Sequence, residues 1–485
     1  MEVRKTGTGG AARADDLVAE LAARLGPDCV LSGPEVLGYC RDWHGDVTTG
    51  ALAVLRPRNT QDVVRSVRAA AELKLAIVPQ GGNTGLVLGA IPDQPSGQVI
   101  ISLERMTEIR SLEPDDFSVV AEAGVILSDL KEKVEESGLF FPLSLGAQGS
   151  CRIGGNVSTN AGGINVLRYG MTRDLVLGLE VVLPDGSIFE GLSTLRKDNR
   201  GIDLKQLFIG AEGTLGIITA VSLKLMPKVE QVATALLGLA SLDDAIALYR
   251  RARRDCCDLM SAFEFMPPLA FTLAREAMPD LPLPMKDHYP AYVLMEISGS
   301  GLVDVDDLMQ RFLEAVMEDG LVLDGVVAQS RLQARNLWLF REGMNEGQAK
   351  RGLHLRTDLS VSLSRLAEFV GEAEAAVRAR LPECLCVSYG HVGDGNVHLN
   401  VLPPSDLSLA EKAEMIAKSK LVLNEVLDRF GGSISAEHGI GRLKRDDFLK
   451  RLPKPQADLL AAIKQAIDPD RIMNPGCQLN FDGIW

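Results

Sequence analysis

The chain has 485 residues, of which 46% are hydrophobic and 24% are charged, and its formal net charge at pH 7 is −14. This composition is typical of a globular protein large enough for two or three domains, and it excludes a fibrous or intrinsically disordered chain. The acidic balance and the dispersed basic residues argue against a general nucleic-acid-binding role and favour small molecules or proteins as partners.

The eight cysteines are scattered along the chain. Neither the adjacent Cys256 and Cys257 nor Cys384-x-Cys386 has the spacing of a disulfide framework or of a zinc knuckle, so we expect a reducing compartment. Residues 1–16 lack the apolar core of a signal peptide, and we expect no transmembrane segment. These features predict a cytoplasmic protein, or one of the mitochondrial matrix if the source is eukaryotic.

The first region, residues 46–228, alternates short β-rich runs with glycine-rich turns. Residues 51–55 and 75–78 have the composition of strands. Residues 60–74 between them predict a helix with Thr60 as its N-cap and Asp62 in its first turn. The pattern predicts a βαβ unit.

The second of these strands runs into Pro79-Gln80-Gly81-Gly82-Asn83-Thr84-Gly85, where glycines remove the side chains that would keep a ligand from the backbone amides. Such a loop can hold a pyrophosphate. It matches neither Gly-x-Gly-x-x-Gly nor the P-loop pattern, so it predicts neither a Rossmann fingerprint nor an NTPase site. Two further runs of glycine and small residues, 146–163 and 208–218, indicate close backbone packing against a large flat ligand, although some of these glycines are expected only to make turns.

The middle region, residues 229–418, has helical patterns at 241–254, 303–318 and 363–380, interleaved with strands such as 291–297, whereas residues 278–290 predict a loop. Within it, residues 338–345 predict a helical turn that sets Arg341 and Asn345 on one face. A guanidinium is suited to bind a carboxylate by two parallel hydrogen bonds. The alternative for Arg341 is a surface ion pair with Glu342 or Glu346.

Three of the six histidines, His391, His398 and His438, lie near the C-terminal end. Residues 397–401 alternate so that His398 and Asn400 share one face of a predicted strand. Two imidazoles and a carboxylate, here Glu437, are ligands that a divalent metal takes, and a further imidazole can move a proton. Because His-x6-His is not a familiar zinc spacing, the alternative is that both histidines are turn or core residues. A helix from about residue 421 and another at 454–467 complete the chain.

In this order, the three glycine-rich runs resemble the flavin-binding domain of the vanillyl-alcohol oxidase and p-cresol methylhydroxylase superfamily. The segments around His391 and Glu437-His438, with Arg341 upstream, resemble the D-2-hydroxy-acid dehydrogenases within it, most closely those that act on D-2-hydroxyglutarate. The resemblance covers about residue 40 to Asn480. It implies an α+β fold with a two-part FAD-binding domain (1–228), an α+β substrate cap (229–418) and a C-terminal helical segment (419–485) that completes the active site.

The resemblance implies that the glycine-rich runs and one C-terminal residue hold FAD. These residues are Pro79, Gln80, Gly81, Gly82, Asn83, Thr84, Gly85, Leu86, Gly149, Ser150, Gly154, Asn156, Asn160, Gly162, Gly163, Glu212, Gly213, Ile218 and Asn474. The first loop would hold the pyrophosphate, and the third run, from Glu212 to Ile218, would lie towards the adenosine half. Because Asn83 stands where some members carry a flavin-bonding histidine, we expect non-covalent FAD, with Cys151 as a small buried hydrophobe.

For the reaction, the resemblance implies Zn²⁺, or Mn²⁺ or Co²⁺, bound by His391, His398 and Glu437, with His438 as the general base. Asn396, Asn400 and His438 would orient the substrate, and Arg341, Asn345 and Arg356 would bind its carboxylates. Arg356 and Asn345 stand where better-known hydroxyglutarate enzymes carry lysine and threonine. The sequence therefore leaves open whether the distal carboxylate is bound in the same geometry.

The expected activity is FAD- and metal-dependent oxidation of D-2-hydroxyglutarate, and also of D-malate, to the 2-oxo acid, with electrons passed to an electron-transfer flavoprotein or a quinone. The alternatives are a D-lactate or glycolate dehydrogenase of the same family and a flavoprotein subunit of a glycolate oxidase complex. The sequence is compatible with a homodimer.

Overall fold

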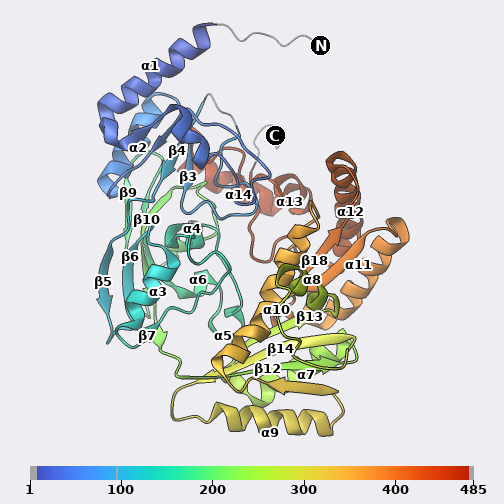
Figure 1. Ribbon diagram of the computed structural model, residues 1–485. Helices are drawn as coiled ribbons and strands as arrows, with labels where there is room; N and C mark the ends of the chain where they lie inside the picture. Colours follow the sequence, from blue (N-terminus) through green and yellow to red (C-terminus); the bar gives the residue numbers. More distant parts are fainter. Residues whose placement is uncertain (1–7, 94–96, 480–485) are drawn as a thin grey trace. The chain divides into compact units, whose positions relative to one another are not determined.

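The computed structural model describes residues 8–93 and 97–479, and the chain forms two compact units (Figure 1). The first unit combines Met1–Ala161, Met171–Pro227 and Glu437–Trp485, and the second combines Gly162–Gly170 and Lys228–Ala436. No helix within the described ranges is long and apolar enough to cross a lipid bilayer.

The first unit opens with a four-stranded sheet in the order β1-β2-β4-β3. Its elements are α1 (Thr8–Leu25), η1 (Pro27–Cys29), β1 (Val30–Leu31), η2 (Gly33–Tyr39), β2 (Ala53–Leu55), α2 (Thr60–Glu72), β3 (Ala76–Gln80) and β4 (Gln98–Ser102). Strands β2 and β3 each pair in parallel with β4, so the predicted βαβ unit is confirmed, with β4 inserted between its two strands.

The N-cap predicted for this helix is wrong by one residue. Asn59 has extended backbone angles and its side chain accepts a hydrogen bond from the backbone N–H of Asp62 at 2.9 Å, which is the geometry of an N-cap. Thr60 is the first helical residue, and its hydroxyl donates to Oε1 of Glu180 at 2.6 Å.

A second sheet in the first unit is antiparallel throughout, in the order β5-β6-β10-β8-β9. The strands and their neighbours are β5 (Ile109–Glu113), β6 (Ser118–Glu122), α3 (Leu127–Glu135), β7 (Leu139–Phe140), α4 (Ile153–Ser158), α6 (Thr172–Leu175), β8 (Val176–Val182), β9 (Ile188–Gly191), η3 (Leu204–Leu207), β10 (Ile217–Lys224) and β11 (Met226–Pro227). The central strand β10 is buried from Ile217 to Leu223, so both of its faces are covered.

The C-terminal segment belongs to the first unit and contains α13 (Arg445–Arg451) and α14 (Lys454–Ile467). After α14 the chain lies beside β3, where Ile77 donates to the carbonyl of Ile472 and accepts from the N–H of Asn474, both at 2.7 Å. The buried ammonium of Lys464 donates to Met473 O at 2.8 Å and to Oδ2 of Asp468 at 2.5 Å. This anchoring returns the end of the chain to the glycine-rich loops.

The second unit has an antiparallel sheet in the order β13-β14-β12-β15 and a smaller one in the order β16-β18-β17. Its elements are α5 (Val166–Tyr169), β12 (Gln231–Leu239), α7 (Leu242–Asp255), η4 (Cys257–Leu259), β13 (Met260–Met266), α8 (Leu269–Ala277), β14 (Ala291–Gly299), α9 (Val305–Glu318), β15 (Asp324–Val327), α10 (Arg331–Lys350), β16 (Leu359–Ser360), η5 (Leu363–Arg365), α11 (Leu366–Arg380), β17 (Leu385–Tyr389), η6 (Val392–Asp394), β18 (Asn396–Leu402) and α12 (Leu409–Phe430).

Helices α8 and α10 pack closely, and their contact fixes α10 in the core of the second unit (Figure 1). A Cβ added to Gly347 would lie 2.1 Å from the carbonyl oxygen of Leu273, so only glycine permits this approach. Phe340 on α10 and Phe271 on α8 stack with ring centroids 4.9 Å apart. The face of α10 that carries Phe340 and Arg341 is therefore buried.

Candidate functional site

The loop after β3 lines a cavity of about 370 Å³ in the first unit. The sequence-predicted residues Gln80, Gly81, Gly82, Asn83, Gly149 and Ser150 all line it, so the first two glycine-rich runs meet. A Cβ on Gly82 would lie 2.1 Å from the carbonyl oxygen of Ser150, which explains why glycine is needed there. The third run lies against the same loop, since a Cβ on Gly213 would lie 2.8 Å from Cγ of Pro79.

Two asparagines in the glycine-rich runs, Asn83 in the cavity wall and Asn156 in α4, bear on the binding of a flavin dinucleotide. Asn83 has the left-handed φ of 53° that a tight loop requires, and its Nδ2 donates to the carbonyl of Arg41 at 2.7 Å. The buried Oδ1 of Asn156 has no hydrogen-bond partner among the described residues. An unmatched buried acceptor costs about 1–3 kcal/mol, so Asn156 offers an acceptor for a ligand's N–H or O–H. The glycine-lined loop and the buried acceptor of Asn156 are features that a bound FAD could use.

The remaining residues predicted to hold FAD lie in several elements. Thr84, Gly85 and Leu86 continue the first loop, Gly154 and Asn156 lie in α4, Asn160 follows α4, Ile218 is buried in β10, and Gly162 and Gly163 lie in the short segment of the second unit.

Glu212 joins the third glycine-rich run to the C-terminal segment of the same unit. Its carboxylate accepts hydrogen bonds from the backbone N–H groups of Ile440 and Gly441 and from Nε2 of Gln478, each at 2.8 Å. Nδ2 of Asn474 donates to the carbonyl oxygen of Glu212 at 2.7 Å. Glu212 therefore holds the loop that follows His438, a role that the sequence did not predict.

In the second unit, Arg341 on α10 is buried and forms an ion pair with Glu264 on β13. Nε of Arg341 donates to Oε2 of Glu264 at 2.8 Å. The alternative of a surface ion pair with Glu342 or Glu346 is therefore wrong, because the side chain points into the core. Only Nε is used in this pair, so the two terminal nitrogens suit a bidentate grip on a carboxylate.

The other oxygen of Glu264 meets His391. Its Oε1 lies 2.5 Å from Nδ1 of His391, and the backbone groups of Phe265 and Gly390 exchange two hydrogen bonds that bring these residues together. Burial alone would raise the pKa of Glu264, but the neighbouring His391 and Arg341 lower it to about 2. As a carboxylate, Glu264 only accepts hydrogen bonds, so Nδ1 of His391 donates to it. In the neutral imidazole this tautomer leaves the lone pair on Nε2.

His398 on β18 is held in the same tautomer by a different group. Its Nδ1 lies 3.0 Å from the carbonyl oxygen of Thr357, which can only accept, so Nδ1 donates and the neutral ring has its lone pair on Nε2. The rings of His391 and His398 are 5.8 Å apart between centroids. An imidazole whose other nitrogen donates to an oxygen is the usual form of a metal-ligating histidine, so each ring has the tautomer that a divalent metal takes.

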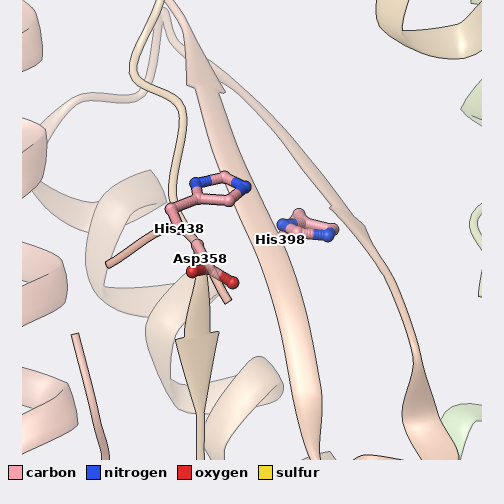
Figure 2. Close-up of side chains that lie close together, drawn as sticks. All are labelled: Asp358, His398 and His438. Atoms are coloured by element: carbon pink, nitrogen blue, oxygen red, sulfur yellow. The ribbon is translucent and has the colours of Figure 1, made fainter. Parts of the chain in front are cut away.

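A second carboxylate, Asp358, lies close to His398. It is fully buried, its Oδ1 accepts from Nδ2 of Asn396 at 3.0 Å, and its carbonyl accepts from the N–H of Ala436 at 3.2 Å, two residues before His438. Figure 2 shows Asp358, His398 and His438, whose potential metal-binding atoms lie within 4.8 Å of one another. Sequence reasoning missed Asp358, because no spacing links it to residues so distant in the chain.

Tyr389, also missed, brings together several predicted substrate-binding residues. Its hydroxyl donates to Oδ1 of Asn345 at 2.7 Å and accepts from Nδ2 of Asn400 at 3.1 Å. The guanidinium of Arg341 lies over its ring, 4.8 Å from the centroid. Arg356 is exposed on the segment that pairs with β18 through Leu355 and Val401.

Comparison with known proteins agrees with this arrangement. Residues 51–191 match the FAD binding domain family, and residues 228–477 match the C-terminal domain of FAD linked oxidases. The chain is 41% identical over 464 residues to the mitochondrial D-2-hydroxyglutarate dehydrogenase of Bos taurus, a match that covers 95% of this chain and 82% of the relative. It is 36% identical to the D-2-hydroxyglutarate dehydrogenase of Stutzerimonas stutzeri, over 95% of this chain and 98% of the relative.

Among solved structures, p-cresol methylhydroxylase with bound substrate has a TM-score of 0.77 at 18% identity, covering 99% of each chain, which confirms the predicted fold. The chain therefore belongs to the family of FAD-linked oxidases that includes these D-2-hydroxyglutarate dehydrogenases, and it is an FAD-dependent oxidoreductase that acts on a CH–OH group.

Proposed function

We propose that the enzyme oxidises D-2-hydroxyglutarate, and also D-malate, to the 2-oxo acid, with a divalent metal bound by His391, His398 and Glu437. The names of its relatives support the substrate class. The observation that carries the proposal is the pair of histidines, His391 and His398. Each has Nδ1 held by an oxygen acceptor, and their rings lie 5.8 Å apart.

Bound FAD supplies a hydride acceptor for the C2–H of the substrate, and the metal supplies Lewis acidity that lowers the pKa of the 2-hydroxyl. His438 takes the hydroxyl proton on an imidazole nitrogen, so one proton leaves for each hydride transferred. Arg341 binds a substrate carboxylate through its terminal nitrogens. Asn345 and Arg356 bind the distal carboxylate.

Asn396 and Asn400 have different parts in orienting the substrate. The buried Oδ1 of Asn396 has no hydrogen-bond partner among the described residues, so it offers an acceptor to a substrate O–H. Asn400 donates to Oε1 of Gln348 at 2.8 Å and accepts from the N–H of Thr357 at 2.9 Å. We infer that Asn400 acts mainly by holding these neighbours in place.

The donor set of two imidazoles and a carboxylate favours Zn²⁺ and is compatible with Mn²⁺ or Co²⁺. The dehydrogenase names of the relatives support an electron-transfer flavoprotein or a quinone as the final acceptor, rather than oxygen. The mitochondrial labels on the eukaryotic relatives support a mitochondrial location if the source is eukaryotic. We propose the matrix in that case and the cytoplasm otherwise.

The decisive test is anaerobic bleaching of the bound flavin by D- and L-2-hydroxyglutarate, malate, lactate and glycolate, before and after chelation. We expect rapid bleaching by D-2-hydroxyglutarate that chelation abolishes and added Zn²⁺ restores. Faster bleaching by lactate or glycolate would show that the substrate is a smaller acid than the proposed diacid. Bleaching that survives complete metal removal would show that the reaction needs no metal.

The role of His438 is tested by His438→Ala, which should lose turnover but keep its flavin. His288→Ala, which alters an exposed loop histidine, is the matched control and should behave as wild type. Turnover that persists in His438→Ala would remove this residue from the mechanism.

A further inference from the structure

Glu264 is a buried carboxylate beside the proposed metal and substrate residues, with 1% of its surface exposed. It lies in β13 and is the only charged residue of the sequence Met-Ser-Ala-Phe-Glu-Phe-Met. Each carboxylate oxygen has its own partner. Oε1 is 2.5 Å from Nδ1 of His391, and Oε2 accepts from Nε of Arg341 at 2.8 Å.

We infer that Glu264 is a positioning residue that fixes both the metal-binding tautomer of His391 and the carboxylate-binding pose of Arg341. Metal binding and acid binding would then depend on one side chain that contacts neither the metal nor the acid. The inference rests on the proposed function, which assigns His391 to the metal and Arg341 to the substrate.

The surrounding structure holds both partners from their other sides. The ring of His391 lies edge-to-face against that of His398, and the guanidinium of Arg341 lies over the ring of Tyr389. The loop that carries His391 is itself constrained, because a Cβ on Gly390 would lie 2.8 Å from the carbonyl oxygen of Asn396. The Glu264 carboxylate therefore joins two groups that are already confined.

The variant Glu264→Gln distinguishes positioning from simple packing, because a glutamine has nearly the same shape but only one acceptor oxygen. If that oxygen faces Nε of Arg341, the amide N–H faces Nδ1 of His391, which must accept, and the ring proton moves to Nε2. If the amide is reversed, its N–H meets the N–H of Arg341. Because an unpaired buried guanidinium is costlier than a change of imidazole tautomer, the first orientation should prevail.

The test is Co²⁺ titration of metal-depleted protein that retains its FAD, followed by the visible absorption of bound Co²⁺. We expect Glu264→Gln to bind Co²⁺ about 10- to 100-fold more weakly than wild type, the usual effect of losing the group that orients a metal-ligating histidine. The KM for D-2-hydroxyglutarate at saturating metal should change less. Flavin content and thermal unfolding verify that the variant is folded.

Glu296→Gln provides a matched control on the neighbouring strand β14. Glu296 accepts from Nε1 of Trp338 at 2.7 Å and from the hydroxyl of Thr234 at 2.7 Å. The control therefore makes the same glutamate-to-glutamine change in the same sheet, at a residue with different hydrogen-bond partners. This control should bind Co²⁺ as wild type does. Equal weakening in both variants would overturn the inference, because it would show a general effect on the sheet.

A second readout reports the tautomer directly. With ¹⁵N-labelled histidine and only six histidines in the chain, the metal-free wild type should show His391 protonated on Nδ1, and Glu264→Gln should show it protonated on Nε2. An unchanged tautomer together with unchanged Co²⁺ affinity would overturn the inference and leave the proposed function intact. Wild-type protein that binds no Co²⁺ and needs no metal would overturn both.

Discussion

The hydroxyl of Tyr389 donates a hydrogen bond to Oδ1 of Asn345 across 2.7 Å, joining the end of β17 to α10. Burial raises the pKa of Tyr389, so this group stays a neutral phenol that can donate. Its oxygen also accepts from Asn400, and its ring lies beneath Arg341. One side chain therefore arranges three of the residues that we propose bind or orient the substrate.

The variant Tyr389→Phe keeps the ring beneath Arg341 and removes the hydroxyl. We expect the KM for D-2-hydroxyglutarate to rise about fivefold, because a hydrogen bond of about 1 kcal/mol to the substrate-binding network is lost, and kcat to change little. Steady-state kinetics checks this. The control Tyr289→Phe removes a phenol that donates to Asp324 at 2.9 Å in the same unit, and it should leave KM unchanged. An unaltered KM in Tyr389→Phe would contradict the role given to Tyr389.

Denaturation should release the flavin from the protein. Asn83 has no group that forms a bond to flavin, and Cys151 is buried, which raises the pKa of its thiol and disfavours the reactive thiolate. After acid precipitation we expect the yellow colour in the supernatant and none in the pellet. A yellow pellet that becomes colourless in Cys151→Ser would show covalent attachment at that residue.

Local sequence patterns predicted the elements whose signals lie within a few residues of one another. The helix predicted at 454–467 is α14, and the strand predicted at 397–401 lies within β18. The helix predicted from residue 421 begins instead at Leu409, since Ser408 and Glu411 form a capping box that marked the start and was overlooked.

The residues that organise the candidate site could not be found in this way. Glu264 meets His391 across 127 residues of sequence and Arg341 across 77, so no spacing connects them. The sequence did contain one indication, because Glu264 is the only charged residue of a largely apolar strand. A buried charge requires partners of opposite charge or hydrogen-bond donors. That signal predicts a partner without naming it.

Replacing Glu212 by glutamine should loosen the loop that follows His438. The carboxylate accepts from two backbone N–H groups, at Ile440 and Gly441, and an amide can supply only one acceptor oxygen. We expect faster hydrogen exchange in residues 437–445 and a lower kcat. The matched change Glu132→Gln, on the exposed side of α3, should alter neither. If hydrogen exchange in residues 437–445 of Glu212→Gln were as slow as in the wild type, Glu212 would not be holding this loop.

The pH dependence of stability should reveal the charge of Glu180, a half-buried residue of β8 in the first unit. Burial by itself would raise the pKa of Glu180, but hydrogen bonds from Arg110, Thr60 and Thr219 outweigh burial and lower it. A carboxyl whose pKa is depressed in the folded state stabilises the fold above its unfolded pKa, about 4.3 for glutamate. This contribution is lost as the pH falls through the folded pKa.

The variant Glu180→Gln should therefore lower the free energy of unfolding at pH 7 by about 1.5–3 kcal/mol, the range for hydrogen bonds to a charged group. The difference from wild type should shrink as the pH falls below about 4.3, where Glu180 of the unfolded chain becomes protonated, and it should vanish once the pH has passed the lower pKa of the folded state. Urea unfolding at a series of pH values measures this. Glu190 lies opposite Glu180 on the edge strand β9 and is exposed, so Glu190→Gln should give a pH profile parallel to that of wild type. A Glu180→Gln deficit that stays constant down to pH 3 would mean that packing, rather than the charge of Glu180, stabilises this part of the sheet.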